Sequence, residues 1–73
     1  MSQNPPLITV HTSQGPRQVP VGTTVATLLL ELNAAHTGIA TAVNGAFVAR
    51  HEREHHVLRD GDILLCFAPI TGG

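Results

Sequence analysis

The chain has no lysine, only two aromatic residues and a single cysteine among its 73 residues. Cys66 alone cannot form an internal disulfide, and one unpaired thiol fits a reducing compartment. Four arginines in a chain of formal net charge −1 make no basic stripe of the kind that binds nucleic acid. No apolar run is long enough to span a membrane, and no segment resembles a secretory signal. We therefore expect a soluble, cytoplasmic protein that binds neither nucleic acid nor membrane.

The short length favours one small domain over an enzyme. A domain of this size buries only about 60% of the surface that its unfolded chain exposes. The 42% apolar content allows a small core, whereas a deep catalytic cleft is hard to build. We expect a folded domain over residues 7–68, between a flexible leader at 1–6 and a flexible tail at 69–73.

One segment has the pattern of an amphipathic helix. Thr24 is a suitable N-cap, because its hydroxyl can accept a backbone N–H two or three residues later. Apolar residues follow at helical spacing, at Val25, Leu28, Leu29 and Leu32. Leu30 falls off this stripe and is expected to be partly exposed. The helix should end around Ala35.

Short β-branched or apolar runs bounded by turn residues predict strands. These runs are Leu7–His11, Arg17–Val21, Ile39–Val43, Phe47–Val48 and Asp62–Ala68. Asn44-Gly45 is a strong tight-turn signal, and Asp60–Asp62 reads as a turn before the last strand. Pro20 cannot donate to a ladder, so its strand should lie at an edge. Residues 50–59 predict an irregular connection with one helical turn or a short strand.

This order of elements predicts an α+β fold, because neither one helix nor one sheet face can be buried alone. We expect a ubiquitin-like β-grasp: a mixed four- to five-stranded sheet with the helix packed across it. The first and last strands would pair in parallel at its centre.

The sequence ends in Gly72-Gly73, directly after the last predicted strand. Glycine has no Cβ, so two in a row form a thin stalk that can enter a narrow slot. Folding does not require such an ending. A thin tail is required when the C-terminal carboxylate must enter the active site of another protein.

With that order and ending, the chain resembles the ubiquitin-like sulfur carriers of bacterial cofactor synthesis, the ThiS family in particular. The resemblance covers nearly everything from Leu7 onward. It rests on Gly22–Val25 at the helix start, Ala42–Gly45 at the central turn, Val48–Arg50 with its spacing to Gly61-Asp62, and Ile70–Gly73. Ala49 stands where ThiS sequences usually carry proline. Pro69 is similar to the tail of the MoaD carriers of molybdopterin synthesis.

The resemblance implies that Gly73 carries the only reactive group, its carboxylate. A ThiF-type enzyme using ATP and Mg²⁺ would adenylate it, and a sulfur donor such as a cysteine desulfurase would supply a persulfide or sulfide that displaces AMP. The resulting thiocarboxylate would give its sulfur to the thiazole synthase ThiG in thiamine biosynthesis. The chain itself would be a cosubstrate with no cofactor and no catalytic residue of its own.

Three parts of the chain would serve this chemistry. Gly72, Thr71 and Ile70 form the tail with Gly73, and Pro69 fixes φ near its root. Counting back from the diglycine as in ubiquitin, the resemblance places Leu65 and Phe67 outward and Leu64 and Cys66 inward. An outward apolar face beside the tail would be a partner interface, although Phe67 could instead belong to the core. Arg50 is either a partner contact, since guanidinium pairs with carboxylates, or a surface arginine.

Other functions stay open. Within the carrier class, a MoaD-like subunit or a carrier for another sulfur pathway is the alternative. Two alternatives lie outside the carrier class: a non-reactive β-grasp interaction module and a ubiquitin-like protein that is conjugated to amines.

Two further patterns favour structural roles. His51–His55 matches the H-E-x-x-H zinc-protease motif, which requires a firm helix, a third ligand and a cleft; we expect a solvated loop and no metal site. Cys66 lies in a strand without an evident positive charge nearby, so a buried structural thiol is expected rather than a sulfur relay. Asp60 and Asp62 are expected to form the turn around Gly61.

Overall fold

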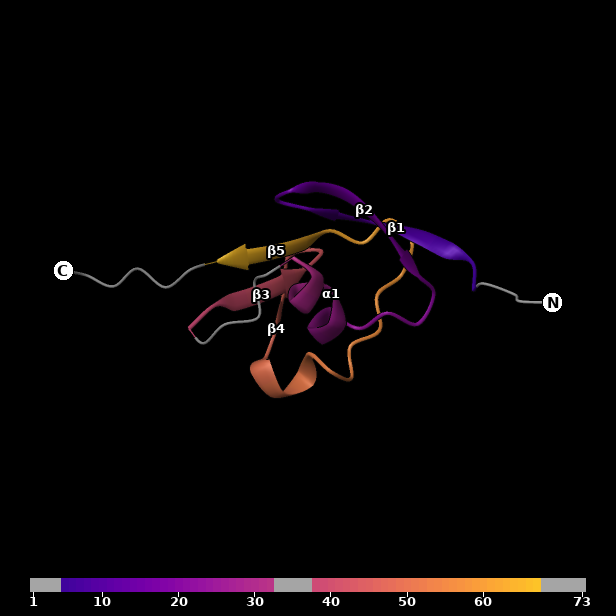
Figure 1. The fold of residues 1–73 in the computed structure, drawn as a ribbon. Coiled ribbons are helices and arrows are strands. Elements are labelled where there is room, and N and C mark those ends of the chain that lie inside the picture. Colours follow the sequence, from indigo (N-terminus) through magenta and orange to yellow (C-terminus); the bar gives the residue numbers. More distant parts are fainter. Residues whose placement is uncertain (1–4, 33–37, 68–73) are drawn as a thin grey trace.

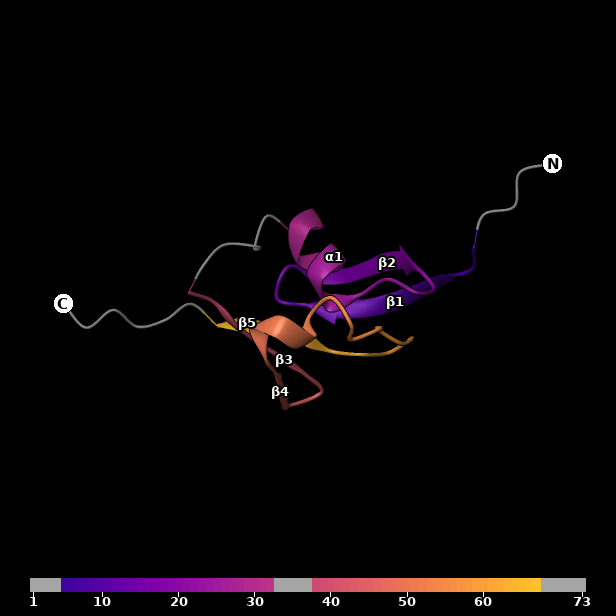
Figure 2. The same ribbon diagram turned by 90° about the horizontal axis from the view of Figure 1, so that it is seen from below.

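The computed structural model describes residues 5–32 and 38–67. Its elements in chain order are β1 (Leu7–Thr12), β2 (Gly15–Pro20), α1 (Val25–Glu31), β3 (Ala40–Val43), β4 (Ala46–Val48), a 3₁₀ helix (Arg50–Glu52) and β5 (Leu64–Phe67). Figures 1 and 2 show α1 lying against the strands. The α+β, ubiquitin-like β-grasp prediction is confirmed by this arrangement and by the similarity to a solved fold reported below.

The helix begins as its sequence predicts. The Thr24 hydroxyl accepts a hydrogen bond from the Thr27 amide, and Thr24 is the N-cap. Leu28 and Leu29 are buried, whereas Leu30 on the opposite side is 68% exposed. The predicted end near Ala35 is wrong: α1 ends at Glu31. Leu32 is the C-cap: its amide donates to the Leu28 carbonyl at 3.0 Å, and its side chain is still buried.

The strands form two groups within the described residues. β1 and β2 pair antiparallel, and β3 lies between β4 and β5, antiparallel to both. The predicted parallel pairing of the first and last strands is reduced to one bridge, His11 with Ile63, next to a 2.8 Å hydrogen bond from the His11 amide to the Asp62 carbonyl. The pairing stops because β1 ends at Thr12, directly before the chain turns back into β2.

Pro20 and the Asn44-Gly45 turn lie where the sequence placed them. Pro20 is in β2, which pairs only with β1 among the described strands and is therefore an edge strand. Asn44 and Gly45 both have positive φ, 53° and 84°, as a two-residue hairpin between β3 and β4 requires. Residues 50–59 form an irregular connection with one 3₁₀ turn, the first of the two expected alternatives, and Val57 makes an isolated bridge to Thr24.

One core holds the two strand groups and the helix together. It is formed by Ile8, Val10, Val19, Val25, Leu28, Leu29, Leu32, Val43, Val48, Leu58 and Leu64. Residues from every strand and from α1 contribute, and Leu58 adds an anchor from the irregular segment. That segment is held along α1 by hydrogen bonds from the Val25 amide to the His56 carbonyl and from the Ala26 amide to the Arg53 carbonyl, both 3.0 Å. No helix among the described residues is long and apolar enough to cross a membrane.

Candidate functional site

The outer face of the three-stranded sheet carries the predicted partner surface. Alternate residues of a strand point to opposite faces, so the pairing register sorts them into rows. One outward row consists of Phe47, Ala42 and Leu65, and the next of Ala40 and Phe67. We call these five residues the outer apolar face.

Exposure confirms the predicted orientation of β5. Phe67 is 53% and Leu65 36% exposed, whereas Leu64 is 1% exposed and Cys66 packs against the core. Phe67 is therefore an exposed aromatic and not a member of the core. Two bulky side chains on one strand thus remain in water although the core lies just behind them.

Phe47 is a residue of this face that the sequence reasoning missed. It is 69% exposed, and Phe47 and Phe67 are the two aromatic residues of the chain. The sequence does contain the information needed to place it. A two-residue hairpin at Asn44-Gly45 pairs Val43 with Ala46, and this register pairs Ala42 with Phe47. The two phenylalanines thus lie on either side of small alanines, with Phe47 on β4 and Phe67 on β5.

The two strands that carry these aromatics leave the sheet at one end. β4 and β5 are both antiparallel to β3, so they run in the same direction and end at the start of β3, β4 opposite Thr41 and β5 opposite Ala40. β5 continues there into residues 68–73, and β4 continues into Arg50, which is exposed. The predicted tail residues Ile70, Thr71, Gly72 and Gly73, and Pro69, lie outside the described residues. The structure therefore brings Leu65 and Phe67 together and places Arg50 at the same end of the sheet.

Arg53 is half-buried and forms a connection that the sequence did not reveal. Its Nη2 donates to the Ile39 carbonyl at 2.7 Å, and its Nε donates to the Thr41 hydroxyl at 3.2 Å. Thr41 is fully buried and in turn donates to the Val48 carbonyl at 3.0 Å. Because Cys66 pairs with Thr41 in the register, this arginine lies on the same inner face as the thiol. Our expectation of no positive charge near Cys66 was therefore wrong.

That charge does not activate the thiol. Burial raises the pKa of the Cys66 thiol, and the opposing effect of Arg53 is smaller. A raised pKa keeps the group protonated, and the thiolate is the nucleophilic form. The structure thus supports a structural cysteine over a sulfur relay.

We expect iodoacetamide to alkylate Cys66 several-fold more slowly in the folded chain than in the chain unfolded by urea at pH 8. The raised pKa of the thiol leaves less thiolate in the folded state. By the same linkage, its contribution to stability is complete below the ordinary pKa and declines as the pH rises above it. Equal or faster alkylation of the folded chain, measured by mass spectrometry, would refute this assignment.

The H-E-x-x-H pattern does not adopt the geometry of a zinc protease. His51 and Glu52 lie in the 3₁₀ helix, and His55 follows in a turn, so no α-helix carries the motif. The Glu52 carboxylate accepts the Ala49 amide at 3.1 Å. In residues 5–32 and 38–67, no group of three or more histidine, cysteine or acidic side chains is placed to hold a metal ion.

The two aspartates form the turn, as predicted. The Asp60 carboxylate accepts the Thr9 amide, and the Asp62 carboxylate accepts the Arg59 amide, both at 2.8 Å. Asp62 also accepts the Asn44 side-chain amide at 2.9 Å. These bonds tie the start of β5 to β1 and to the hairpin of β3 and β4.

Known proteins are similar to this chain in sequence and in fold. The model of the ThiS family matches residues 9–73. The sulfur carrier protein ThiS of Escherichia coli strain K12 is 39% identical over 56 residues, which are 77% of this chain and 85% of that protein. The crystal structure of the thiamine biosynthesis protein ThiS from Geobacter metallireducens superposes with a TM-score of 0.76 at 22% identity, covering 90% of this chain and all of the other.

Proposed function

The chain belongs to the ThiS family, and on that basis we propose that it is a sulfur carrier whose reactive group is the carboxylate of Gly73. The observation that carries the proposal is the family match, which extends through the terminal Gly72-Gly73 and includes a relative named as a sulfur carrier. The described domain supports it by presenting an exposed apolar face beside the strand that leads into the tail.

The chemistry requires activation, because a carboxylate has no good leaving group. In the proposed first step, the Gly73 carboxylate attacks ATP bound with Mg²⁺ in a ThiF-type enzyme, forming an acyl-adenylate and releasing pyrophosphate. Sulfide, released when thiols reduce the persulfide of a cysteine desulfurase, then attacks the acyl carbon and AMP leaves. The product is a C-terminal thiocarboxylate, which donates its sulfur to thiazole formation by ThiG. The carrier holds no cofactor in this scheme and acts as a cosubstrate.

The outer apolar face is the surface we assign to docking of the adenylating enzyme. Exposed contiguous apolar surface on a small protein commonly marks a contact with a partner. β5 ends at Phe67, six residues before Gly73, so a protein that holds the tail is within reach of this ring. We also assign Arg50, which is exposed at the same end of the sheet, to pairing with a carboxylate of that enzyme.

This function is tested by pyrophosphate release with a purified ThiF-type enzyme, ATP and Mg²⁺. We expect release that depends on the presence of this chain and on a free Gly73 carboxylate. No carrier-dependent release with any ThiF-type enzyme from the same genome would contradict the proposal.

The docking assignment makes a separate prediction. Phe67→Ala should raise the concentration of carrier that half-saturates pyrophosphate release by about tenfold, since interface aromatics often contribute more than about 1 kcal/mol. Its free energy of unfolding should change by less than about 1 kcal/mol, because the ring is 53% exposed. Leu7→Ala, on β1 and equally exposed at 59%, is the matched control and should leave both quantities unchanged. A Phe67→Ala chain that loses stability and binds its enzyme normally would place the ring in the core after all.

A further inference from the structure

A hollow lies on the other side of the three-stranded sheet from the outer apolar face. It is lined by the end of β3 with its turn and by the segment before β5: Val43, Asn44, Ala46, His55, His56, Val57, Arg59 and Asp62. Val43 and Ala46 form a row on the inner face, in register with buried Leu64. The hollow is open to solvent and is not used by the proposed tail chemistry.

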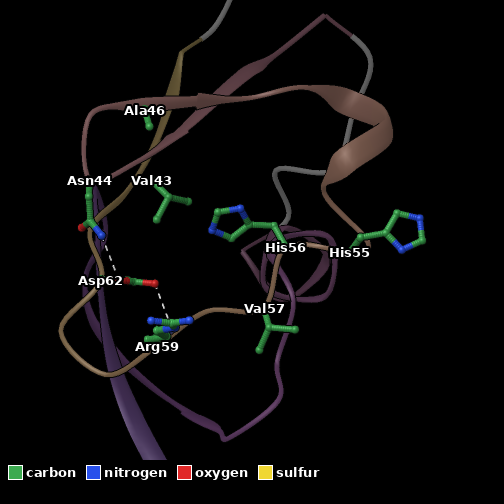
Figure 3. Close-up of a pocket in the computed structure, with 8 residues that line it drawn as sticks. All are labelled: Val43, Asn44, Ala46, His55, His56, Val57, Arg59 and Asp62. Atoms are coloured by element: carbon green, nitrogen blue, oxygen red, sulfur yellow. Dashed lines mark hydrogen bonds between the residues drawn. The ribbon is translucent and has the colours of Figure 1, made fainter.

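His56 is the side chain directed into this hollow. Figure 3 shows its ring reaching into the space beside Val43 and Ala46, while the ring of His55 points away. The backbone of His56 is fixed, because its carbonyl accepts the Val25 amide at 3.0 Å. Arg59 also lines the hollow, and its backbone is fixed by the hydrogen bond from its amide to the Asp62 carboxylate. Two nitrogen-bearing side chains with fixed backbones therefore face one open space.

The acidic groups around the hollow are already hydrogen-bonded. The Asp62 carboxylate uses both oxygens, one for the Arg59 amide and one for the Asn44 side chain. Glu52, which lines an adjoining hollow with His51, accepts the Ala49 amide. The negative charge of Asp62 and Glu52 makes the electrostatic potential of this region less positive. Their hydrogen bonds, however, come from backbone and side-chain amides and not from His56 or the Arg59 guanidinium.

The surrounding segment is the cationic part of an acidic chain. Residues 50–59 hold three of the four arginines and three of the five histidines, against two glutamates. The segment therefore has a formal charge of +1 with neutral histidines, and the rest of the chain, one arginine against three acids, has −2.

We propose that the hollow lined by His56 and Arg59 binds a carboxylate presented by an acidic segment of a second protein. Imidazole and guanidinium are both donors to carboxylates, and guanidinium can bind both oxygens at once. An open hollow leaves a small free anion largely hydrated, so an acidic side chain delivered by a protein surface is the better fit. Complementary charges of this kind mainly orient the partner and speed its association.

The hollow is lined by inner-face residues and not by Leu65 or Phe67, although Phe47 lines the hollow that adjoins it. A protein bound there can therefore leave the exposed side chains of β5 uncovered. The inference therefore goes beyond the proposed function and does not depend on it: a carrier could hold this second protein while its tail is being processed.

The test is a ¹H–¹⁵N NMR titration of the full chain with a capped hexaglutamate peptide at pH 7.5 in low salt. We expect saturable shifts at the amides of Asn44, His56 and Arg59. Arg59→Gln should weaken binding about threefold, as the loss of one exposed charge pair would, and His56→Gln, which removes the imidazole donor from the hollow, should weaken it as well. The dispersion of each spectrum shows that the variant is folded.

Matched controls separate a site from general attraction. Arg17→Gln removes the same charge from β2, His11→Gln removes an exposed imidazole from β1, and Phe67→Ala alters the outer apolar face; all three should leave binding unchanged. The proposal is overturned if hexaglutamine binds as well as hexaglutamate, if Arg17→Gln weakens binding as much as Arg59→Gln, or if the shifts are not saturable. Free glutarate binding as tightly as the peptide would overturn the assignment to a protein partner.

Discussion

One residue added after Gly73 is expected to abolish pyrophosphate release while leaving the domain folded. The addition moves the carboxylate by about 3.5 Å along an extended chain. A displacement of about 1 Å can cost about 100-fold in rate when reacting groups must be aligned, so we expect a loss of at least that size. The measurement is carrier-dependent pyrophosphate release by a ThiF-type enzyme, with circular dichroism to confirm the fold.

The same residue placed before Met1 is the control, and it should leave release unchanged because the reactive end is untouched. Gly72→Val tests the thin stalk without moving the carboxylate: a β-branched side chain restricts the backbone and widens the tail, so activation should also be lost. Gly72→Ala, with a single methyl group, should be impaired less. Normal adenylation of the Gly72→Val chain would refute the steric argument for the diglycine.

The second large effect concerns the core. Leu28→Ala should lower the free energy of unfolding by about 2–5 kcal/mol, because a fully buried leucine loses its transfer energy and leaves a cavity. A domain of 73 residues has only about 4–11 kcal/mol in total at the usual stability per residue. The variant should therefore unfold at a much lower urea concentration, measured by circular dichroism.

Leu30→Ala on the same helix is the matched control. Its side chain is 68% exposed, so the same truncation should cost less than about 0.5 kcal/mol. Equal losses in the two variants would contradict the burial of the Val25–Leu32 stripe against the sheet.

Local patterns account for most of the fold that could be predicted. The helical stripe, the Thr24 cap and the Asn44-Gly45 turn depend on residues within one or two turns of each other, so spacing alone identifies them. Predicting the outward position of Leu65 and Phe67 required more information than the local pattern contains. Alternation gives two equivalent sets of residues, and the choice between them came from the resemblance to ubiquitin-like proteins.

Long-range contacts account for what could not be predicted. Arg53 bonds to residues 12 and 14 positions away, and its backbone holds the first turn of α1, but a charged loop residue carries no signal of such burial. Without that position, the positive charge near Cys66 could not be inferred. Likewise, the length of the pairing between β1 and β5 depends on the residue at which β1 turns away. The apolar pattern of the two strands does not specify that residue.

Intact mass spectrometry tests the central claim most directly. The chain would be co-expressed with a ThiF-type enzyme and a cysteine desulfurase, and its C-terminal peptide sequenced by fragmentation. Our account predicts a mass increase equal to the replacement of one oxygen by sulfur, located at Gly73. A folded chain that ends in a free Gly73 and keeps an unchanged mass with every such enzyme would contradict it and favour a non-reactive interaction module.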